Sequence, residues 1–323
     1  MIWLSTILLA IGLALLGGTS GIVISSIVAI SEKRKLRKSV VSFLLVAFST
    51  SLPEFFVAIN SIIIGNMSVS LGDILGSNIT NISLIVGTSL IVAAVTRSRK
   101  RKITIGEEEK KEFTTGLMIL SITLLALLYL QYMSRLIGVF LLCVFLGYSY
   151  ILFRKRREDV VSVSNETKGE RIRKELVFIT VGIAGTLIGA RLTVESAIDI
   201  ATYLGVPSSI IGATLVAFGT SLPELTVDVR AAHRGYLEIT IGDIVGSCFL
   251  NSTLILGLLL AFTPFKVNLL VLSDLILFSV VSNLLLWYFL DNGKMGSREG
   301  LILLTFYLVN LLSILGILVL RVP

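Results

Sequence analysis

Charged side chains are scarce in this chain, and their scarcity defines its class. Asp, Glu, Lys and Arg make up 15% of the 323 residues, whereas soluble globular domains carry roughly a quarter. Hydrophobic residues make up 54%, and the mean hydropathy is +0.93. These values exclude a soluble globular protein and indicate a chain embedded in the lipid bilayer. The loops between the apolar runs are too short to form a separate soluble domain.

Cysteine and histidine are nearly absent as well. Cys143 and Cys248 both lie inside apolar runs, which predicts buried thiols and neither a disulfide nor a thiolate metal site. The single histidine, His233, stands at the end of an apolar run, where we expect it in solvent. With so little thiolate and imidazole available, zinc and copper sites are disfavoured.

The net charge of +7 has an explanation other than nucleic acid. Basic residues stand in short blocks between apolar runs, as the positive-inside rule requires, so we expect no nucleic-acid partner. Most of them fall in alternate loops that include residues 33–38, 97–111 and 154–174, whereas the opposite side holds Arg135, Lys266 and Arg321. This asymmetry places the loop at 31–38 in the cytoplasm and both termini outside the plasma membrane.

Ten apolar runs are long enough to span a hydrocarbon core, which takes about 20 helical residues. They occupy residues 2–30, 39–64, 70–96, 113–131, 135–153, 177–203, 208–232, 238–264, 267–290 and 299–320. The first run lacks a basic n-region, so we interpret it as a retained helix rather than a signal peptide. The predicted fold is an all-α integral membrane protein with ten transmembrane helices.

One stretch of the sequence occurs twice. Residues 45–54, LVAFSTSLPE, recur as residues 215–224, with Gly219 in place of Ser49, and the Gly-Asp-Ile-x-Gly-Ser segment at 72–77 recurs at 242–247. Five predicted helices separate equivalent points, and an odd number makes the second copy enter the membrane from the opposite face. We therefore predict two inverted five-helix repeats, 1–153 and 177–323, joined by a basic cytoplasmic linker at 154–176. Inverted repeats are typical of secondary transporters.

Glu54 and Glu224 occupy equivalent positions in the repeats, each about midway along an apolar run. An acidic residue at this depth costs roughly 2.5–3.5 kcal/mol on insertion scales. A buried basic partner would explain the two acids structurally, but the second and seventh predicted helices hold no Lys or Arg at comparable depth. We therefore predict that the two carboxylates bind an ion or a proton.

The residues beside the two glutamates favour a cation. Pro53 and Pro223 each lack a backbone donor and clash with the carbonyl one turn earlier, so the carbonyls of Ser49 and Gly219 need other partners. Such carbonyls either coordinate a cation at a helix break or accept bonds from nearby hydroxyls in a simple kink.

Hydroxyl and amide side chains share helix faces with these groups. Thr50 and Ser51 can face the same way as Glu54, and Thr220 and Ser221 the same way as Glu224. On the following helices, every fourth residue is polar, in the series Asp73, Ser77, Asn81 and the series Asp243, Ser247, Asn251. Their oxygen ligands suit hard cations such as Ca²⁺ and Na⁺.

Other polar and small residues have more than one interpretation. Asp73 and Asp243 lie near predicted helix starts, where they either cap the helix or attract cations to the pathway. The glycines of Gly72-x-x-x-Gly76 and Gly242-x-x-x-Gly246 predict close helix packing. Arg191, Glu195 and Asp199 stand four residues apart, which predicts an interfacial salt-bridged face rather than a site.

The two Thr-Ser-Leu-Pro-Glu motifs, each followed by Gly-Asp-x-x-Gly-Ser, resemble the paired alpha repeats of the calcium/cation antiporter superfamily. Within it, the chain is most similar to the prokaryotic sodium/calcium exchanger branch. The similarity extends over nearly the whole chain, and calcium/proton exchangers usually carry a different motif. The resemblance therefore implies an antiporter that exchanges Ca²⁺ for Na⁺ by alternating access.

The resemblance also implies a set of ligands. Glu54 and Glu224 would bridge a central Ca²⁺ with the backbone carbonyls of Thr50 and Thr220. Flanking Na⁺ sites would use the hydroxyls of Ser51, Ser77, Ser221 and Ser247 and the carbonyls of Ala47 and Ala217, and Asn81 and Asn251 would complete the middle. The sequence departs from the family pattern at Ser49, where Gly is common, and at Asn251, where relatives often carry Asp.

Alternative functions stay open at this point. A Ca²⁺/H⁺ exchanger would use the same glutamates in ion-bound and protonated forms, and a cation channel would need a continuous pore. The first and sixth predicted helices precede the site helices and carry no site residues, so we expect them to slide across the bundle. We expect the chain to work in the bilayer as a monomer, without cofactor or enzymatic activity.

Overall fold

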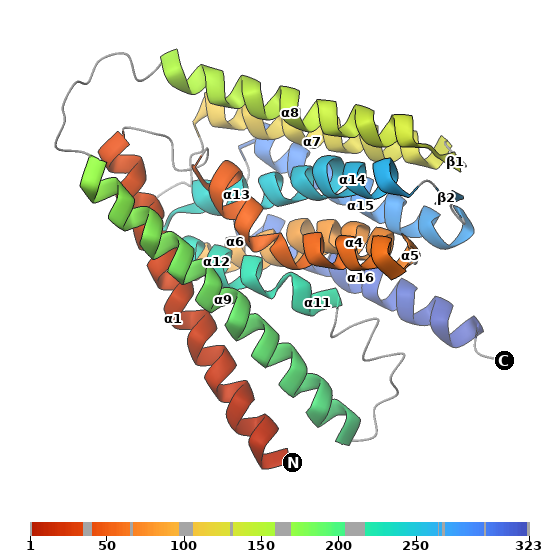
Figure 1. Ribbon diagram of the computed structural model, residues 1–323, viewed down its shortest axis with the longest axis horizontal. Helices are drawn as coiled ribbons and strands as arrows, with labels where there is room; N and C mark the ends of the chain where they lie inside the picture. Colours follow the sequence, from red (N-terminus) through yellow and green to blue (C-terminus); the bar gives the residue numbers. More distant parts are fainter. Residues whose placement is uncertain are drawn as a thin grey trace.

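The structure is a computed structural model that describes residues 2–34, 41–64, 67–96, 106–129, 132–158, 169–203, 217–263, 265–266, 269–293 and 295–321. These residues are almost entirely helical (Figure 1), as the composition predicts. A helix satisfies its backbone hydrogen bonds internally, which a chain in hydrocarbon requires.

The first half contains α1 (Ile2–Arg34), the π-helical η1 (Ser42–Val46), α3 (Ala47–Thr50), α4 (Leu52–Ile64), α5 (Met67–Ile79), the π-helical η2 (Thr80–Val86), α6 (Gly87–Thr96), α7 (Glu107–Tyr129) and α8 (Arg135–Glu158). The second half contains α9 (Gly169–Tyr203), α11 (Ala217–Thr220), α12 (Leu222–His233), α13 (Leu237–Leu250), the π-helical η5 (Asn251–Ile255), α14 (Leu256–Phe262), α15 (Leu269–Asp291) and α16 (Ser297–Arg321).

Five helical stretches are long and apolar enough to cross a bilayer by length and composition. They are Trp3–Ile30, Ser70–Thr96, Arg135–Leu152, Leu237–Phe262 and Ser273–Asp291. They support a protein that crosses the membrane several times. The other predicted spans do not meet this criterion within the described residues, so the number of ten remains a prediction. The predicted span at 208–232 begins outside the described residues, because its first part, 208–216, is not among them.

The helices that flank the predicted linker are longer than the apolar runs indicated. The helix predicted at 135–153 continues as α8 to Glu158, and the helix predicted at 177–203 begins as α9 at Gly169. The middle of the predicted linker, residues 159–168, lies outside the described residues. Charged residues end an apolar run but not a helix, because Arg, Lys and Glu are good helix formers.

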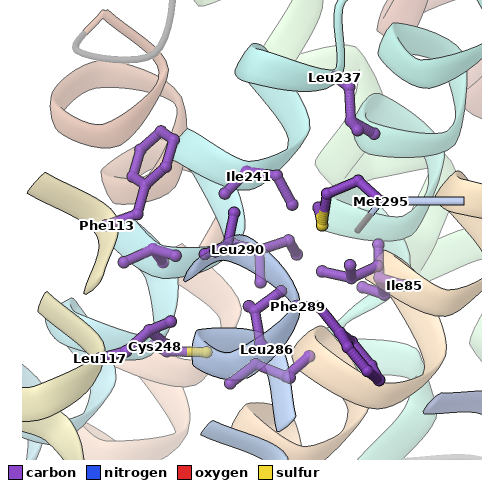
Figure 2. Packing of buried hydrophobic residues seen from close by; sticks show 14 of the residues in the cluster. Ile85, Phe113, Leu117, Leu237, Ile241, Cys248, Leu286, Phe289, Leu290 and Met295 are labelled. Carbon is purple, nitrogen blue, oxygen red and sulfur yellow. The ribbon is translucent and has the colours of Figure 1, made fainter. Parts of the chain in front are cut away.

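Helix α13 lies in the centre of the molecule, and 13 of its 14 residues are buried. Figure 2 shows side chains of α7, α13 and α15 meeting in one cluster, among them Phe113, Ile241 and Leu286. Cys248 belongs to this cluster and is buried, as predicted. Cys143 is exposed, which corrects the prediction of a buried thiol, because its helix α8 is peripheral and turns one face outward.

Helices α1 and α9 pack along each other at one side of the molecule (Figure 1). Their backbones approach closely at Gly189, where an added Cβ would lie 3.0 Å from the Gly12 carbonyl oxygen. The Thr19 and Thr186 hydroxyls are 2.9 Å apart across the same contact. Small residues permit this close packing between helices in a membrane.

Two short strands join distant loops. β1 (Tyr132–Met133) pairs antiparallel with β2 (Phe265–Lys266). Elsewhere, Lys110 Nζ donates to the Asp291 carbonyl oxygen at 2.6 Å and lies 3.8 Å from the Asp291 carboxylate. The β1–β2 pair joins the loops that precede α8 and α15. The Lys110–Asp291 contact joins the start of α7 to the end of α15.

Candidate cation site

Two matched helix breaks lie at the centre of the site. α3 ends at Thr50 and α4 begins at Leu52, while α11 ends at Thr220 and α12 begins at Leu222. Ser51 and Ser221 stand at the breaks with nearly equal backbone angles, φ −81 and ψ 11 for the first and φ −88 and ψ 5 for the second. The proline two residues later cannot donate a backbone hydrogen bond, and it is tolerated only in the first turn of a helix. A new helix therefore begins just before each proline.

The two predicted glutamates sit in the first turns of the restarted helices, and each has an exposed fraction of 0%. Ser77 Oγ donates to Glu54 Oε1 at 3.2 Å, and Ser51 Oγ donates to Glu224 Oε1 at 3.3 Å. The second bond connects the two halves of the chain. The carboxylates are close enough for their charges to repel each other. The structure thus brings both acids into one buried centre.

Both predicted asparagines are buried beside this centre at irregular helical turns. Asn81 lies in η2, and Asn251 is the first residue of η5. Asn251 Nδ2 donates to Asn78 Oδ1 at 3.4 Å, and Asn78 Nδ2 donates to Ser252 Oγ at 2.8 Å. π-Helical turns inside α-helices often occur at functional sites, since they redirect a side chain and its carbonyls.

Several buried polar atoms at the centre have no hydrogen-bond partner among the described residues. They are Oε2 of Glu54 and of Glu224, Oγ of Ser221 and Ser247, Oδ1 of Asn81 and of Asn251, and Nδ2 of Asn81. Native proteins leave few buried polar atoms unpaired, and each one calls for an explanation such as an ion. Unpaired oxygens at these positions fit coordination of a hard cation.

The backbone ligands implied by the resemblance lie at the same breaks. The Ala47 carbonyl oxygen accepts from Ser51 N at 3.1 Å, and Thr50 is buried directly before the break. Ala217 begins α11 and Thr220 ends it, so their carbonyls occupy the matched place in the second half. The side chain of Ala217 lies outside the described part of the chain.

Asp73 and Asp243 correct the helix-capping interpretation. Neither is at a helix start, because α5 begins at Met67 and α13 begins at Leu237. Thr220 Oγ1 donates to Asp73 Oδ1 at 3.2 Å, which again joins the two halves. Asp243 is fully buried and interacts electrostatically with Glu224. Both acids therefore lie around the candidate cation site.

Sequence reasoning missed two buried residues near the centre, Asp228 and Asn78. Asp228 is fully buried in α12, one turn beyond Glu224. The insertion cost that singled out Glu224 applies equally to Asp228 and could have found it. The repeat hides it, because the equivalent position in the first half is Ala58. Asn78 is next to a predicted ligand but outside the every-fourth-residue series.

The polar residues that were predicted to lie away from the site do so. Arg191 Nε donates to Glu195 Oε1 at 2.7 Å, and both side chains are exposed. Asp199 accepts a bond from Ser5 Oγ at 3.2 Å, and His233 is exposed at the end of α12. Neither ion pair found among the described residues involves a site carboxylate.

Close packing at Gly246 yields a prediction about stability. A Cβ at Gly246 would lie 2.8 Å from Phe43 O and from Ala47 Cβ, whereas nothing among the described residues lies within 4 Å of a Cβ at the equivalent Gly76. The close-packing prediction is thus correct for Gly246 and wrong for Gly72 and Gly76, which have open space.

We expect Gly246→Ala to lower the stability of the purified protein by about 1–3 kcal/mol, because overpacking shifts the backbone of η1. Gly76→Ala is the matched control and should leave the thermal midpoint unchanged or raise it slightly, since Ala favours a helix. Thermal unfolding of both variants in the same detergent measures the difference. Equal midpoints would contradict the packing described here.

Comparison with known proteins adds independent findings. The profile of the sodium/calcium exchanger protein family matches residues 4–154 and 174–316. The chain is 31% identical to the sodium/calcium exchanger MaX1 of Methanosarcina acetivorans over 96% of this chain and 98% of that one. It is 30% identical to an uncharacterised membrane protein of Methanocaldococcus jannaschii, over 85% of this chain and 86% of that one.

The fold also matches a solved structure. The sodium-calcium exchanger NCX_Mj, soaked with 10 mM Na⁺ and zero Ca²⁺, superposes with a TM-score of 0.84 at 27% identity. The match covers 97% of this chain and 99% of that one, so the agreement extends through both halves.

Proposed function

Because the chain belongs to the sodium/calcium exchanger family, we propose that it is a secondary active antiporter that exchanges Ca²⁺ for Na⁺ across the cell membrane. The observation that carries this proposal is the buried centre formed by both halves, where Glu54 and Glu224 keep unpaired oxygens. The function is transport rather than catalysis, and it needs no cofactor.

Charge explains why the two ions compete. Two carboxylates balance one Ca²⁺, and the same oxygens can instead be occupied by Na⁺ ions, so both loads cannot bind in full together. Glu54 and Glu224 hold the central ion with the Thr50 and Thr220 carbonyls. The hydroxyls of Ser51, Ser77, Ser221 and Ser247, the carbonyls of Ala47 and Ala217 and the amides of Asn81 and Asn251 supply the remaining oxygens for Ca²⁺ or Na⁺.

The proposed architecture is two inverted five-helix repeats, residues 1–153 and 177–323, with a cytoplasmic linker between them. The matched helix breaks at Ser51 and Ser221 support the repeat, and the family profile leaves out residues 155–173 of the proposed linker. All ligands come from one chain, which supports a functional monomer.

Loop contacts support the proposed topology, in which alternate loops share one side of the membrane. β1 pairs with β2, which joins two loops on the proposed outer side. Lys110 contacts Asp291, and Arg234 donates to Ser25 Oγ at 2.7 Å, which joins segments on the proposed cytoplasmic side. Each contact thus connects loops that the distribution of Lys and Arg assigns to the same side.

The test is ⁴⁵Ca²⁺ uptake into proteoliposomes that contain the purified chain. We expect uptake when Na⁺-loaded vesicles are diluted into Na⁺-free buffer, because Na⁺ leaving the vesicle exchanges for Ca²⁺. Vesicles loaded with K⁺ are the control and should behave like protein-free vesicles. Uptake driven by a proton gradient without Na⁺ would favour a Ca²⁺/H⁺ exchanger, and uptake without any counter-ion gradient would indicate a channel.

A further inference from the structure

A pair of aspartates lies between the central site and the turn that joins α12 to α13. The chain reverses at Arg234 and Gly235, and Gly235 has φ 84. Asp228 lies between one and two turns before the end of α12 at His233, and Asp243 lies between one and two turns after the start of α13 at Leu237, so they are at matched depth on neighbouring helices. Thr240 Oγ1 donates to the Asp228 carbonyl oxygen at 2.9 Å and ties the helices together there.

Both carboxyl groups are buried, and no basic side chain within the described part of the chain acts on Asp228. Each residue has an exposed fraction of 0%, and the two carboxyl groups contact each other, with no hydrogen bond to any other group among the described residues. The charged groups that act on Asp228 are Asp243 and Glu224, all of the same sign. Arg230 is exposed, and Arg234 donates instead to Gly21 O and Ser25 Oγ.

A third oxygen lies on the same helix face. Ser247 follows Asp243 by one turn, so the two side chains share a face of α13. Its Oγ is fully buried and also lacks a partner, although the equivalent Ser77 Oγ donates to Glu54. The Ser247 hydroxyl is therefore available both to the central site and to the aspartate pair.

The first half of the chain does not hold such a pair at its equivalent positions. Ala58 stands where the second half has Asp228, and it is buried in an apolar cluster. The first-half counterpart of Asp243 is Asp73, which accepts a bond from Thr220. Among the described residues, the second half places two buried carboxyl groups against each other at these positions, and the first half does not.

Adjacent buried carboxylates without a positive charge cost several kcal/mol, and either a proton shared between them or a cation bound between them removes that cost. Two negative charges balance one divalent ion, and carboxylate and hydroxyl oxygens are ligands that Ca²⁺ accepts. We propose that Asp228 and Asp243, with Ser247 Oγ, form a second Ca²⁺ site beside the central one. Its role rests on the proposed function: it holds Ca²⁺ between the central carboxylates and the α12–α13 turn.

The test is equilibrium binding of ⁴⁵Ca²⁺ to the purified full chain in lipid nanodiscs without Na⁺. We expect the wild type to bind two Ca²⁺ per chain and Asp228→Asn to bind one. Asp228→Ala, which reproduces the residue of the first half, should also bind one. Asp199→Asn changes an exposed aspartate and is the matched control, which should keep both ions.

A central-site variant separates this proposal from the proposed function. Glu54→Gln should lose one ion and keep the one held by the aspartates. If the wild type bound a single Ca²⁺ that Glu54→Gln lost and Asp228→Asn kept, the second site would be overturned and the exchanger would stand. A single ion lost only in Asp228→Asn would support the second site and contradict the central one. Absence of any Ca²⁺ binding by the wild type would overturn both.

A second measurement needs no aspartate variant. A hydrophobic carbodiimide modifies buried carboxyl groups, and mass spectrometry locates the adduct on the wild-type chain. We expect Ca²⁺ to protect Asp228 and Asp243 from modification, in the wild type and also in Glu54→Gln. Modification of both aspartates to the same extent with and without Ca²⁺ would overturn the site, whether or not the aspartate variants fold.

Discussion

Glu54→Gln and Glu224→Gln should each reduce Na⁺-dependent Ca²⁺ uptake to the level of protein-free vesicles. Both side chains are fully buried, and each keeps one oxygen without a partner. Glutamine has nearly the same shape but no charge, so a single remaining carboxylate cannot balance Ca²⁺. Loss of one partner from a buried charged cluster costs about 3–5 kcal/mol, which weakens binding by roughly 10²-fold to 4 × 10³-fold. Uptake of ⁴⁵Ca²⁺ by each variant measures the effect.

The control is Glu195→Gln, which removes an exposed carboxylate of α9 and should leave uptake unchanged. Its partner Arg191 is also exposed, and surface ion pairs contribute about 0–1 kcal/mol. All three variants need the same elution profile as the wild type, so that loss of transport is not loss of folding. Retained transport in Glu54→Gln or Glu224→Gln would remove these residues from the ion site.

The paired motif predicted the two helix breaks and the two buried glutamates of the candidate site, because each copy of the motif carries this information within a few residues. Each Thr-Ser-Leu-Pro-Glu segment encodes a helix break and a buried acid, and a proline produces its break whatever surrounds it. The structure places the breaks at Ser51 and Ser221, two residues before each proline. The composition also predicted that the chain is almost entirely helical, because a backbone in hydrocarbon must satisfy its hydrogen bonds internally.

Contacts between the halves were not predictable from the same patterns. The bonds from Ser51 to Glu224 and from Thr220 to Asp73 depend on how two distant segments pack. Periodicity gives the face of a helix that a residue occupies, but not which other helix that face meets. For the same reason the sequence misjudged Cys143, which lies in an apolar run on the outer face of a peripheral helix.

The proposed exchange cycle makes α1 and α9 the moving elements. They pack on each other through glycines and through the Thr19–Thr186 hydroxyl contact. Their contact with the site helices includes Leu16 of α1, which packs on Leu222 of α12 beside the second break. Because α1 and α9 pack closely on each other, they can slide together as one rigid body over the rest of the bundle.

Cross-linking Leu16→Cys to Leu222→Cys should therefore stop Ca²⁺ uptake, because it fastens the moving pair to the helix that carries Glu224. The matched control links Thr19→Cys to Thr186→Cys, which joins α1 to α9 inside the pair and should leave uptake unchanged. Both double variants carry Cys143→Ala, since that thiol is exposed, and both receive the same bis-methanethiosulfonate reagent, which joins the two thiols through disulfides that a reductant cleaves. Reduction of the cross-link should restore uptake in the first variant.

The two cross-links together distinguish three ways of opening the site. Uptake that survived the Leu16–Leu222 link would mean that α1 stays fixed to α12 and that access changes elsewhere in the bundle. Loss of uptake with both links would mean that α1 and α9 move past each other, in spite of the close backbone contact at Gly189. Loss with the first link alone fits rigid sliding, since interfaces packed as closely as α1 against α9 resist internal shear.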